Sequence, residues 1–159
     1  MCKKIVRSLL LVCALLTCFM MSSCSKAKSY KDIKSVAYAS ILTQKESSYM
    51  VFLYGDTCVA CEELEELICK YANVASKDDS KKRLYVLNTS NTRVNKGVIA
   101  EGGDDSFTSF IGTANYEDIK IATTPALICV QNGQVSYYIS TKLTQTPKSD
   151  IRKYIEKLF

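Results

Sequence analysis

Two cysteines, Cys58 and Cys61, are the residues whose type and spacing most directly indicate chemistry. A C-x-x-C pair can form a disulfide, open it and form it again. The apolar run of residues 50–54 comes shortly before the pair and predicts a buried strand. Gly55 interrupts this run, and the pattern that follows predicts a helix. The two cysteines should therefore lie where a strand passes into a helix.

The periodicity of that helix distinguishes the two sulfurs. Cys61 belongs to a core-facing stripe with helical spacing, whereas Cys58 lies at its edge. A helix N-terminus favours a thiolate through its unpaired N–H groups and the positive end of its dipole. We therefore expect Cys58 to be the accessible nucleophile and Cys61 to be the resolving cysteine. A permanent disulfide or an inert buried pair stays open as an alternative. We expect Asp56 or Thr57 to cap the helix, and the helix to run to about Ala75.

A second motif lies near residue 125. Pro125 follows Thr123-Thr124 and begins an apolar run over residues 126–130. A proline at the first position of a strand costs little, because its missing N–H is not needed there. Asn132-Gly133 then separates this run from another apolar run, which is a strong signal for a β-hairpin.

Together the two motifs resemble those of the thioredoxin family, from roughly residue 30 to the C-terminus. The resemblance implies that Pro125 is cis and lies against the Cys58/Cys61 pair, where it excludes metal. It also implies that the Thr124 backbone and Thr57 contact an extended substrate, and that the activity is thiol–disulfide exchange without a cofactor. The chain departs from the family in having no tryptophan, in the dipeptide Val59-Ala60, and in Phe52, where thioredoxins bury an acid.

We expect an α/β fold: a three-layer α/β/α domain with a central mixed sheet and an insertion, about residues 92–117, before the cis-proline strand. The strand over residues 84–87 should run parallel to the strand over residues 50–54. The remaining expected elements are a first helix over residues 33–42, a short helix over residues 107–116, and a last helix that starts at Thr146-Pro147 with a core stripe of Ile151, Tyr154, Ile155 and Leu158.

The N-terminal residues read as a targeting segment rather than as part of this domain. Lys3, Lys4 and Arg7 precede an apolar stretch over residues 9–21, which is shorter than the ~20 residues of a membrane-spanning helix. Ser22-Ser23 before Cys24 is similar to the lipobox of bacterial lipoproteins. We therefore expect a signal peptide over residues 1–23, lipidation of Cys24, a tether over residues 24–31 and a domain over residues 32–159. An uncleaved anchor or a plain secretion signal is the alternative.

Charge and location limit the partners. The chain has 21 basic and 16 acidic residues, but removal of residues 1–23 leaves 18 basic residues and the same 16 acidic ones. This small excess does not indicate a nucleic-acid partner. An export signal favours disulfide chemistry. We expect a location on the extracytoplasmic face of a bacterial membrane, partners that carry thiols or disulfides outside the cytoplasm, and a redox partner in the membrane.

Two further cysteines do not extend the site. Cys69 lies 11 residues beyond Cys58 on the same helix, ~16 Å away, which is too far for a disulfide. Cys129 lies in an apolar strand and reads as a small buried side chain. With no histidine and no second C-x-x-C, the sequence does not favour zinc, and we expect no metal. The alternative to an enzyme is a non-enzymatic thioredoxin-like binding or accessory module with a structural cysteine pair.

Overall fold

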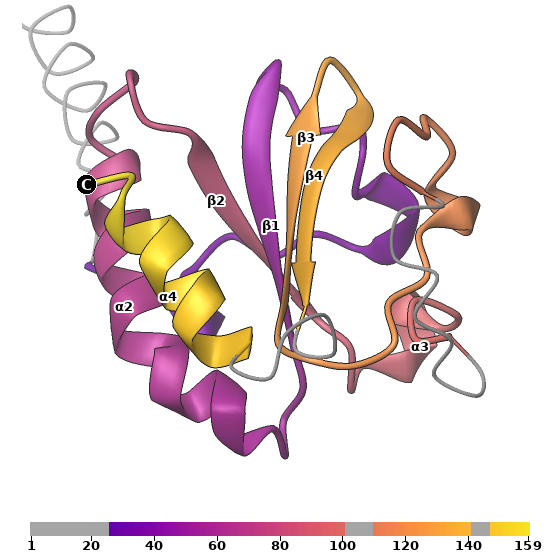
Figure 1. The fold of residues 1–159 in the computed structure, drawn as a ribbon, viewed down its shortest axis with the longest axis horizontal. Helices are drawn as coiled ribbons and strands as arrows, with labels where there is room; N and C mark the ends of the chain where they lie inside the picture. The colour runs from indigo at the N-terminus through magenta and orange to yellow at the C-terminus, as the bar shows by residue number, and fades with distance from the viewer. Residues whose placement is uncertain (1–25, 101–109, 141–146) are drawn as a thin grey trace, which may run out of the picture.

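The computed structural model describes residues 26–100, 110–140 and 147–159 (Figure 1). The elements, with η denoting a 3-10 helix, are η2 (Tyr30–Asp32), η3 (Tyr38–Ser40), β1 (Ser48–Tyr54), α2 (Val59–Ala75), β2 (Arg83–Asn88), α3 (Thr92–Asn95), η5 (Tyr116–Asp118), β3 (Ala126–Gln131), β4 (Gln134–Ser140) and α4 (Pro147–Glu156). Two of the helices in these residues, α2 and α4, have at least ten residues.

The four strands form one mixed sheet in the order β2-β1-β3-β4. β1 pairs with β2 in parallel and with β3 in antiparallel, so that Phe52 lies opposite Val86 on one side and opposite Leu127 on the other. β3 and β4 form an antiparallel hairpin. The expected mixed sheet, including the parallel pairing of its first two strands, is confirmed.

Helices α2 and α4 cover one face of this sheet (Figure 1). Leu64 and Ile68 of α2 and Ile151 and Ile155 of α4 are fully buried and pack in one cluster with Phe52 and other sheet residues. Tyr154 and Leu158 pack against the same cluster, so all four expected residues of the last helix face the core. α4 begins at Pro147, as expected; Thr146 lies outside the described residues.

Short elements rather than a long helix cover the other face of the sheet. Val51, Leu53 and Ile128 point into a second core, which is completed by residues from η3 and the segments around η5. The predicted helix over residues 33–42 is wrong: η2 ends before this stretch, which contains the short η3 and a bridge from Ser35 to Val86 of β2. The reason is that the apolar residues of this stretch divide between the two cores. Ile33 packs on the α2 face, whereas Val36, Tyr38, Ile41 and Leu42 pack on the opposite face, which one straight helix could not reach.

The segment over residues 26–30, here called the N-terminal strap, lies along α2. Ala27 exchanges two hydrogen bonds with the side chain of Asn73, at 2.7 and 2.9 Å. The ring of Tyr30 is buried in the α2-side core. The expected tether over residues 24–31 is therefore packed against the domain over its described part.

The expected insertion over residues 92–117 is only partly described. α3 occupies its start, and Val98 and Phe110 are buried in the second core. Residues 107–109 of the helix predicted over 107–116 lie outside the described residues, and residues 110–115 are not helical. Gly112 has a φ of 89°, and its N–H donates to the carbonyl of Val135, so the chain turns toward β4 here. The predicted helix is wrong for residues 110–115.

The expected signal peptide over residues 1–23 and the expected lipidation site Cys24 lie outside the described residues. Within residues 26–100, 110–140 and 147–159, no helix is both long and apolar enough to cross a membrane.

The hairpin between β3 and β4 turns through Asn132-Gly133, as expected. Asn132 has a φ of 51° and Gly133 a φ of 75°, so both central residues are in the left-handed region. This is the type I′ geometry that matches the twist of the flanking strands.

We predict that Gly133→Ala destabilises the fold by ~1–2 kcal/mol, because a Cβ atom is disfavoured at this positive φ. Steric overlap is not the cause, since the Cβ atom would lie 3.7 Å from the carbonyl oxygen of Leu42. Urea unfolding followed by circular dichroism measures the change. Gln134→Ala, at the exposed first residue of β4, is the control and should change stability by less than ~0.5 kcal/mol. Equal effects of the two substitutions would contradict the assignment.

Candidate active site

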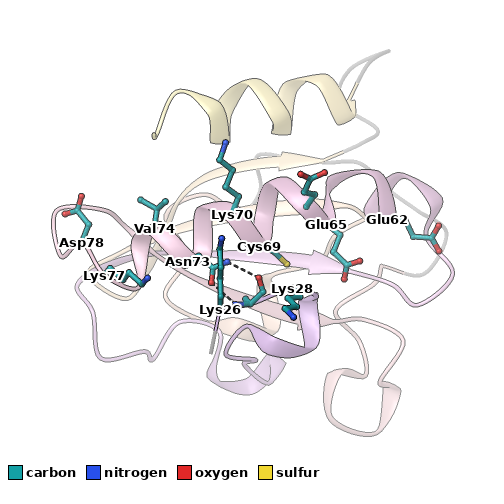
Figure 2. A pocket seen from close by; sticks show the side chains of 12 residues that line it. Lys26, Lys28, Glu62, Glu65, Cys69, Lys70, Asn73, Val74, Lys77 and Asp78 are labelled. Atoms are coloured by element: carbon teal, nitrogen blue, oxygen red, sulfur yellow. Dashed lines mark hydrogen bonds between the residues drawn. The ribbon is translucent and has the colours of Figure 1, made fainter. Parts of the chain in front are cut away.

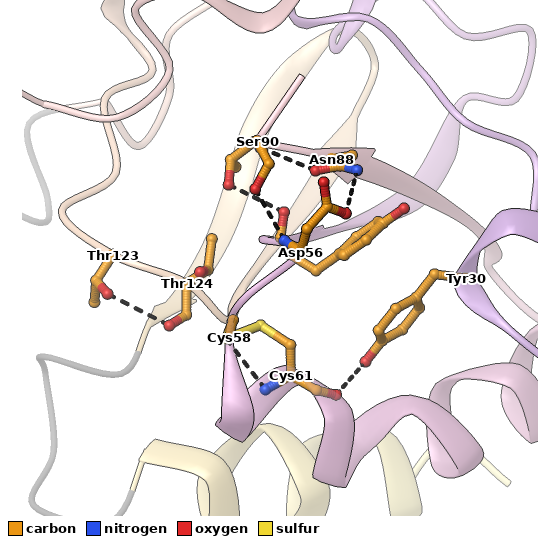
Figure 3. Close-up of a disulfide and its surroundings, with 10 residues drawn as sticks. Tyr30, Asp56, Cys58, Cys61, Asn88, Ser90, Thr123 and Thr124 are labelled. Carbon is orange, nitrogen blue, oxygen red and sulfur yellow. Dashed lines mark hydrogen bonds between the residues drawn. A yellow bond between two sulfur atoms is a disulfide. The ribbon is translucent and has the colours of Figure 1, made fainter. Parts of the chain in front are cut away.

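Cys58 lies at the point where the chain passes from β1 into α2. Cys58 itself is the N-cap of α2, and its sulfur accepts a hydrogen bond from the N–H of Cys61 at 3.2 Å (Figure 3). The prediction that Asp56 or Thr57 caps this helix is therefore wrong. A sulfur can take the capping position because the helix N-terminus supplies unpaired N–H donors to any acceptor placed there. The same donors favour a thiolate once the disulfide is open.

Cys58 and Cys61 form a disulfide with Cα atoms 5.2 Å apart. Cys61 is 1% exposed and belongs to the core cluster beneath α2. Cys58 is half-buried, and Val59 between the cysteines is 67% exposed. The structure thus has one sulfur-bearing residue at the surface and one in the core, which is the arrangement expected from the helical periodicity.

The Thr124–Pro125 peptide bond is cis, as expected from the resemblance. Pro125 directly precedes β3, whose residue Ala126 pairs with Leu53 near the end of β1. A Cβ atom built on Gly55 would lie 3.4 Å from Oγ1 of Thr124, so the Thr124 loop approaches the chain just before the disulfide. In Figure 3, Thr124 and Tyr30 lie on opposite sides of the disulfide. Pro125 is buried and Thr124 half-buried; Thr57, the other expected substrate contact, is exposed.

A polar network fixes the loop before Cys58. The N–H of Asp56 donates to Oγ of Ser90, and the side-chain amide of Asn88 donates to the Asp56 carboxylate, each at 2.9 Å (Figure 3). Asn88 Oδ1 in turn accepts from the N–H of Ser90 at 2.9 Å. Sequence analysis missed both partners. The sequence could have indicated them. Asn88 and Ser90 follow the predicted strand over residues 84–87, which is parallel to β1, and so must lie at the same edge of the sheet as Asp56.

Tyr30 joins the strap to the cysteine pair. Its hydroxyl donates to the carbonyl of Cys61 at 2.6 Å, and its N–H donates to the Glu65 carboxylate at 2.9 Å. The ring stacks on Phe52 and Tyr54, with centroids 5.3 and 4.5 Å away. Burial, followed by the negative charge of Glu65, raises the pKa of Tyr30 well above its ordinary value. The Tyr30 side chain therefore remains a neutral phenol, and its hydroxyl stays hydrogen-bonded to Cys61 in the first turn of α2.

Carboxylates and solvent are the proton acceptors available near the inner cysteine. Phe52, at the position where the resemblance would place a buried acid, is fully buried in the same cluster as Cys61. A cavity of roughly 610 Å³ borders Cys61, and Asp56, Glu62 and Glu65 contribute to its walls. Since the chain has no histidine, these carboxylates and solvent are the candidate proton acceptors for Cys61.

The two remaining described cysteines are buried, free and separate from the pair. Burial raises the pKa of Cys69 to about 11, and burial also raises the pKa of Cys129. The Cys129 sulfur lies 3.2 Å from the Tyr154 hydroxyl inside the core. Across the described part of the chain, no three cysteine, aspartate or glutamate side chains come together as metal ligands.

No family model and no curated protein sequence matches this chain. Solved structures do resemble it. Mitochondrial thioredoxin 3 from Saccharomyces cerevisiae is 12% identical, with a TM-score of 0.48, 82% of this chain and 100% of that chain covered. Thioredoxin f2 from Chlamydomonas reinhardtii is also 12% identical, with a TM-score of 0.48, 79% of this chain and 94% of that chain covered. A structure from work on thiol resolution in yeast mitochondrial 1-Cys peroxiredoxin is 11% identical, with a TM-score of 0.49, 82% of this chain and 100% of that chain covered.

These similarities are too distant to establish the fold family. The fold assignment rests on the chain's own structure: the mixed sheet, the disulfide at the start of α2, and the cis proline just before β3. These are the features that the sequence resemblance implied, and the fold is α/β and thioredoxin-like.

We predict that brief iodoacetamide treatment of the reduced domain at pH 7.5 labels Cys58 first. Cys69 should stay unlabelled, because its raised pKa of about 11 leaves very little thiolate at this pH and because its side chain is buried. Peptide mapping by mass spectrometry gives the order, and labelling in urea shows that every site can react. Labelling of Cys69 as fast as Cys58 would refute the assignment of the nucleophile.

Proposed function

We propose that this protein is a thiol–disulfide oxidoreductase that exchanges disulfides with exported proteins through Cys58 and Cys61. The observation that carries the proposal is the position of the disulfide, with Cys58 as the N-cap of α2 beside the cis-proline loop. A structural disulfide has no need of a half-exposed sulfur at a helix N-terminus. Such a position makes a sulfur both accessible and a better thiolate.

In the reducing direction, the Cys58 thiolate attacks one sulfur of a partner disulfide. A Cys58–partner disulfide forms, and the other partner sulfur leaves as a thiolate that takes a proton from solvent. Cys61 then loses its proton to the carboxylate-lined cavity and attacks the Cys58 sulfur. This step forms the Cys58–Cys61 disulfide and releases the second partner thiolate. Two electrons pass from the protein to the partner, and the oxidising direction reverses every step.

The flanking residues offer a binding surface for an extended segment. Thr124 precedes Pro125, and its loop approaches Gly55 closely. Thr57 and Val59, the chain neighbours of Cys58, are exposed. We propose that the Thr124 backbone and Thr57 bind the partner next to its disulfide, and that Pro125 packs against the sulfurs.

We predict that the domain accelerates the reduction of insulin by dithiothreitol, with loss of the acceleration in Cys58→Ser. Cys61→Ser should keep the first attack but accumulate mixed disulfides, because the residue that resolves them is missing. Turbidity follows the reduction, and non-reducing gels detect the covalent complexes. If wild type and Cys58→Ser behave alike, the pair is structural and the non-enzymatic binding module is the better reading.

The second part of the proposal is the location. Lys3, Lys4, Arg7, the apolar residues 9–21 and Ser22-Ser23-Cys24 support export, cleavage before Cys24 and lipidation of its sulfur. We propose that the domain works on the extracytoplasmic face of a bacterial membrane, where exported proteins carry disulfides.

We predict that Cys24→Ser leaves the protein unprocessed or releases it from the membrane fraction, because the residue that would carry the lipid is missing. Fractionation and intact-mass measurement test this, with Cys18→Ser as the matched control that should change neither result. Wild-type protein without a lipid mass would show the anchoring proposal to be wrong and would leave the redox proposal intact.

A further inference from the structure

The N-terminal strap is fixed along α2 and runs antiparallel to it (Figure 2). At one end, Ala27 is held by two hydrogen bonds to Asn73 in the C-terminal half of the helix. At the other end, Tyr30 is held by Glu65 and by the Cys61 carbonyl in the N-terminal half. The chain therefore has a defined place on the domain over residues 27–30.

This attachment leaves little chain between the proposed lipid and the domain. Only Ser25 and Lys26 separate Cys24 from Ala27. Three residue steps span at most ~11 Å even when fully extended. If Cys24 is anchored in the bilayer, the Asn73 end of α2 must therefore stay close to the membrane surface.

The charges along this side of the domain are segregated in the same direction. The strap and α2 border a groove of roughly 850 Å³, lined by the residues drawn in Figure 2. Three carboxylates border it on the first two turns of α2, towards the disulfide. Four lysines border it on the strap, the later part of α2 and the turn after this helix, against one aspartate in the same turn. The carboxylates are Glu62, Glu65 and Glu66; the lysines are Lys26, Lys28, Lys70 and Lys77, and the aspartate is Asp78.

We propose that the lysine end of this groove rests on anionic phospholipid headgroups and that the disulfide points away from the bilayer. The inference rests on the lipid anchoring proposed for Cys24. Lysine stems can lie on the apolar lining of the groove while their ammonium groups reach the headgroups. The glutamates beside the disulfide are repelled by the same surface, so both ends of the charge distribution favour one orientation.

The orientation sets the height at which exchange takes place. Cys58 and Asn73 are 15 positions apart, and at 1.5 Å per residue this is ~22 Å along the axis of α2. With α2 upright on the bilayer, a partner must present its disulfide about that far above the headgroups. Exported proteins and the outer domains of membrane proteins meet this condition, whereas a disulfide at the level of the bilayer surface does not.

The absence of tryptophan from the chain allows a direct test with the full-length, lipidated protein. One tryptophan is introduced by Val74→Trp in the groove and, in a second protein, by Val59→Trp beside the disulfide. Each protein is reconstituted in vesicles of phosphatidylcholine and phosphatidylglycerol that contain a lipid with a nitroxide on its headgroup. We expect several-fold stronger quenching at position 74 than at position 59. Ser76→Trp, at an exposed residue where α2 ends, repeats the measurement if the larger side chain at position 74 disturbs packing.

Charge dependence separates lipid contact from simple proximity. Vesicles of phosphatidylcholine alone, 0.5 M salt, or the combined change Lys26→Gln, Lys28→Gln and Lys77→Gln should each reduce the difference between positions 74 and 59. Quenching that is equal at the two positions, or stronger at 59, overturns the orientation while leaving anchoring and exchange intact. Lack of lipid on the wild-type protein overturns anchoring, and the orientation falls with it.

Discussion

Burial of β1 on both of its faces is the constraint on which the rest of the structure depends. Met50, Phe52 and Tyr54 enter the core beneath α2 and α4, while Tyr49, Val51 and Leu53 enter the core on the opposite face. Successive side chains over residues 49–54 therefore pack alternately into two separate cores. Because β1 also pairs with a strand on each side, its end is placed accurately, and Cys58 caps α2 only four residues after that end.

The elements with strong local patterns could be predicted from the sequence. β1 and β2 are continuous apolar runs, α2 and α4 have clear helical stripes, and Asn132-Gly133 requires a particular turn. The C-x-x-C and Thr124-Pro125 identified the two halves of the candidate site for similar reasons. In each case, the residues that determine the structure are neighbours in the chain, so the pattern and the structure coincide.

The failures have a different physical origin, since each involves contacts between distant residues. Residues 33–42 look like one amphipathic helix until Ile33 and Val36 are found in different cores. The hydrogen bond from Tyr30 to Cys61 joins residues 31 positions apart, and no local periodicity records it. The capping error has the same origin. Asp56 is a good cap by type, but its carboxylate is bound by Asn88 and its N–H by Ser90, which leaves the capping position to Cys58.

In the proposed function, Cys61 is at once a redox residue and a core residue, because it packs in the same cluster as Leu64 and Phe52. A charge on its sulfur would lie away from water, whereas Cys58 faces solvent at a helix terminus. The reduced protein is therefore chemically asymmetric: one sulfur can meet other molecules, and the other can meet only its neighbour. The proposed exchange therefore follows a fixed order, in which every covalent intermediate with a partner is carried by Cys58. The core thereby keeps the inner thiol from being captured by a second partner before the first has left.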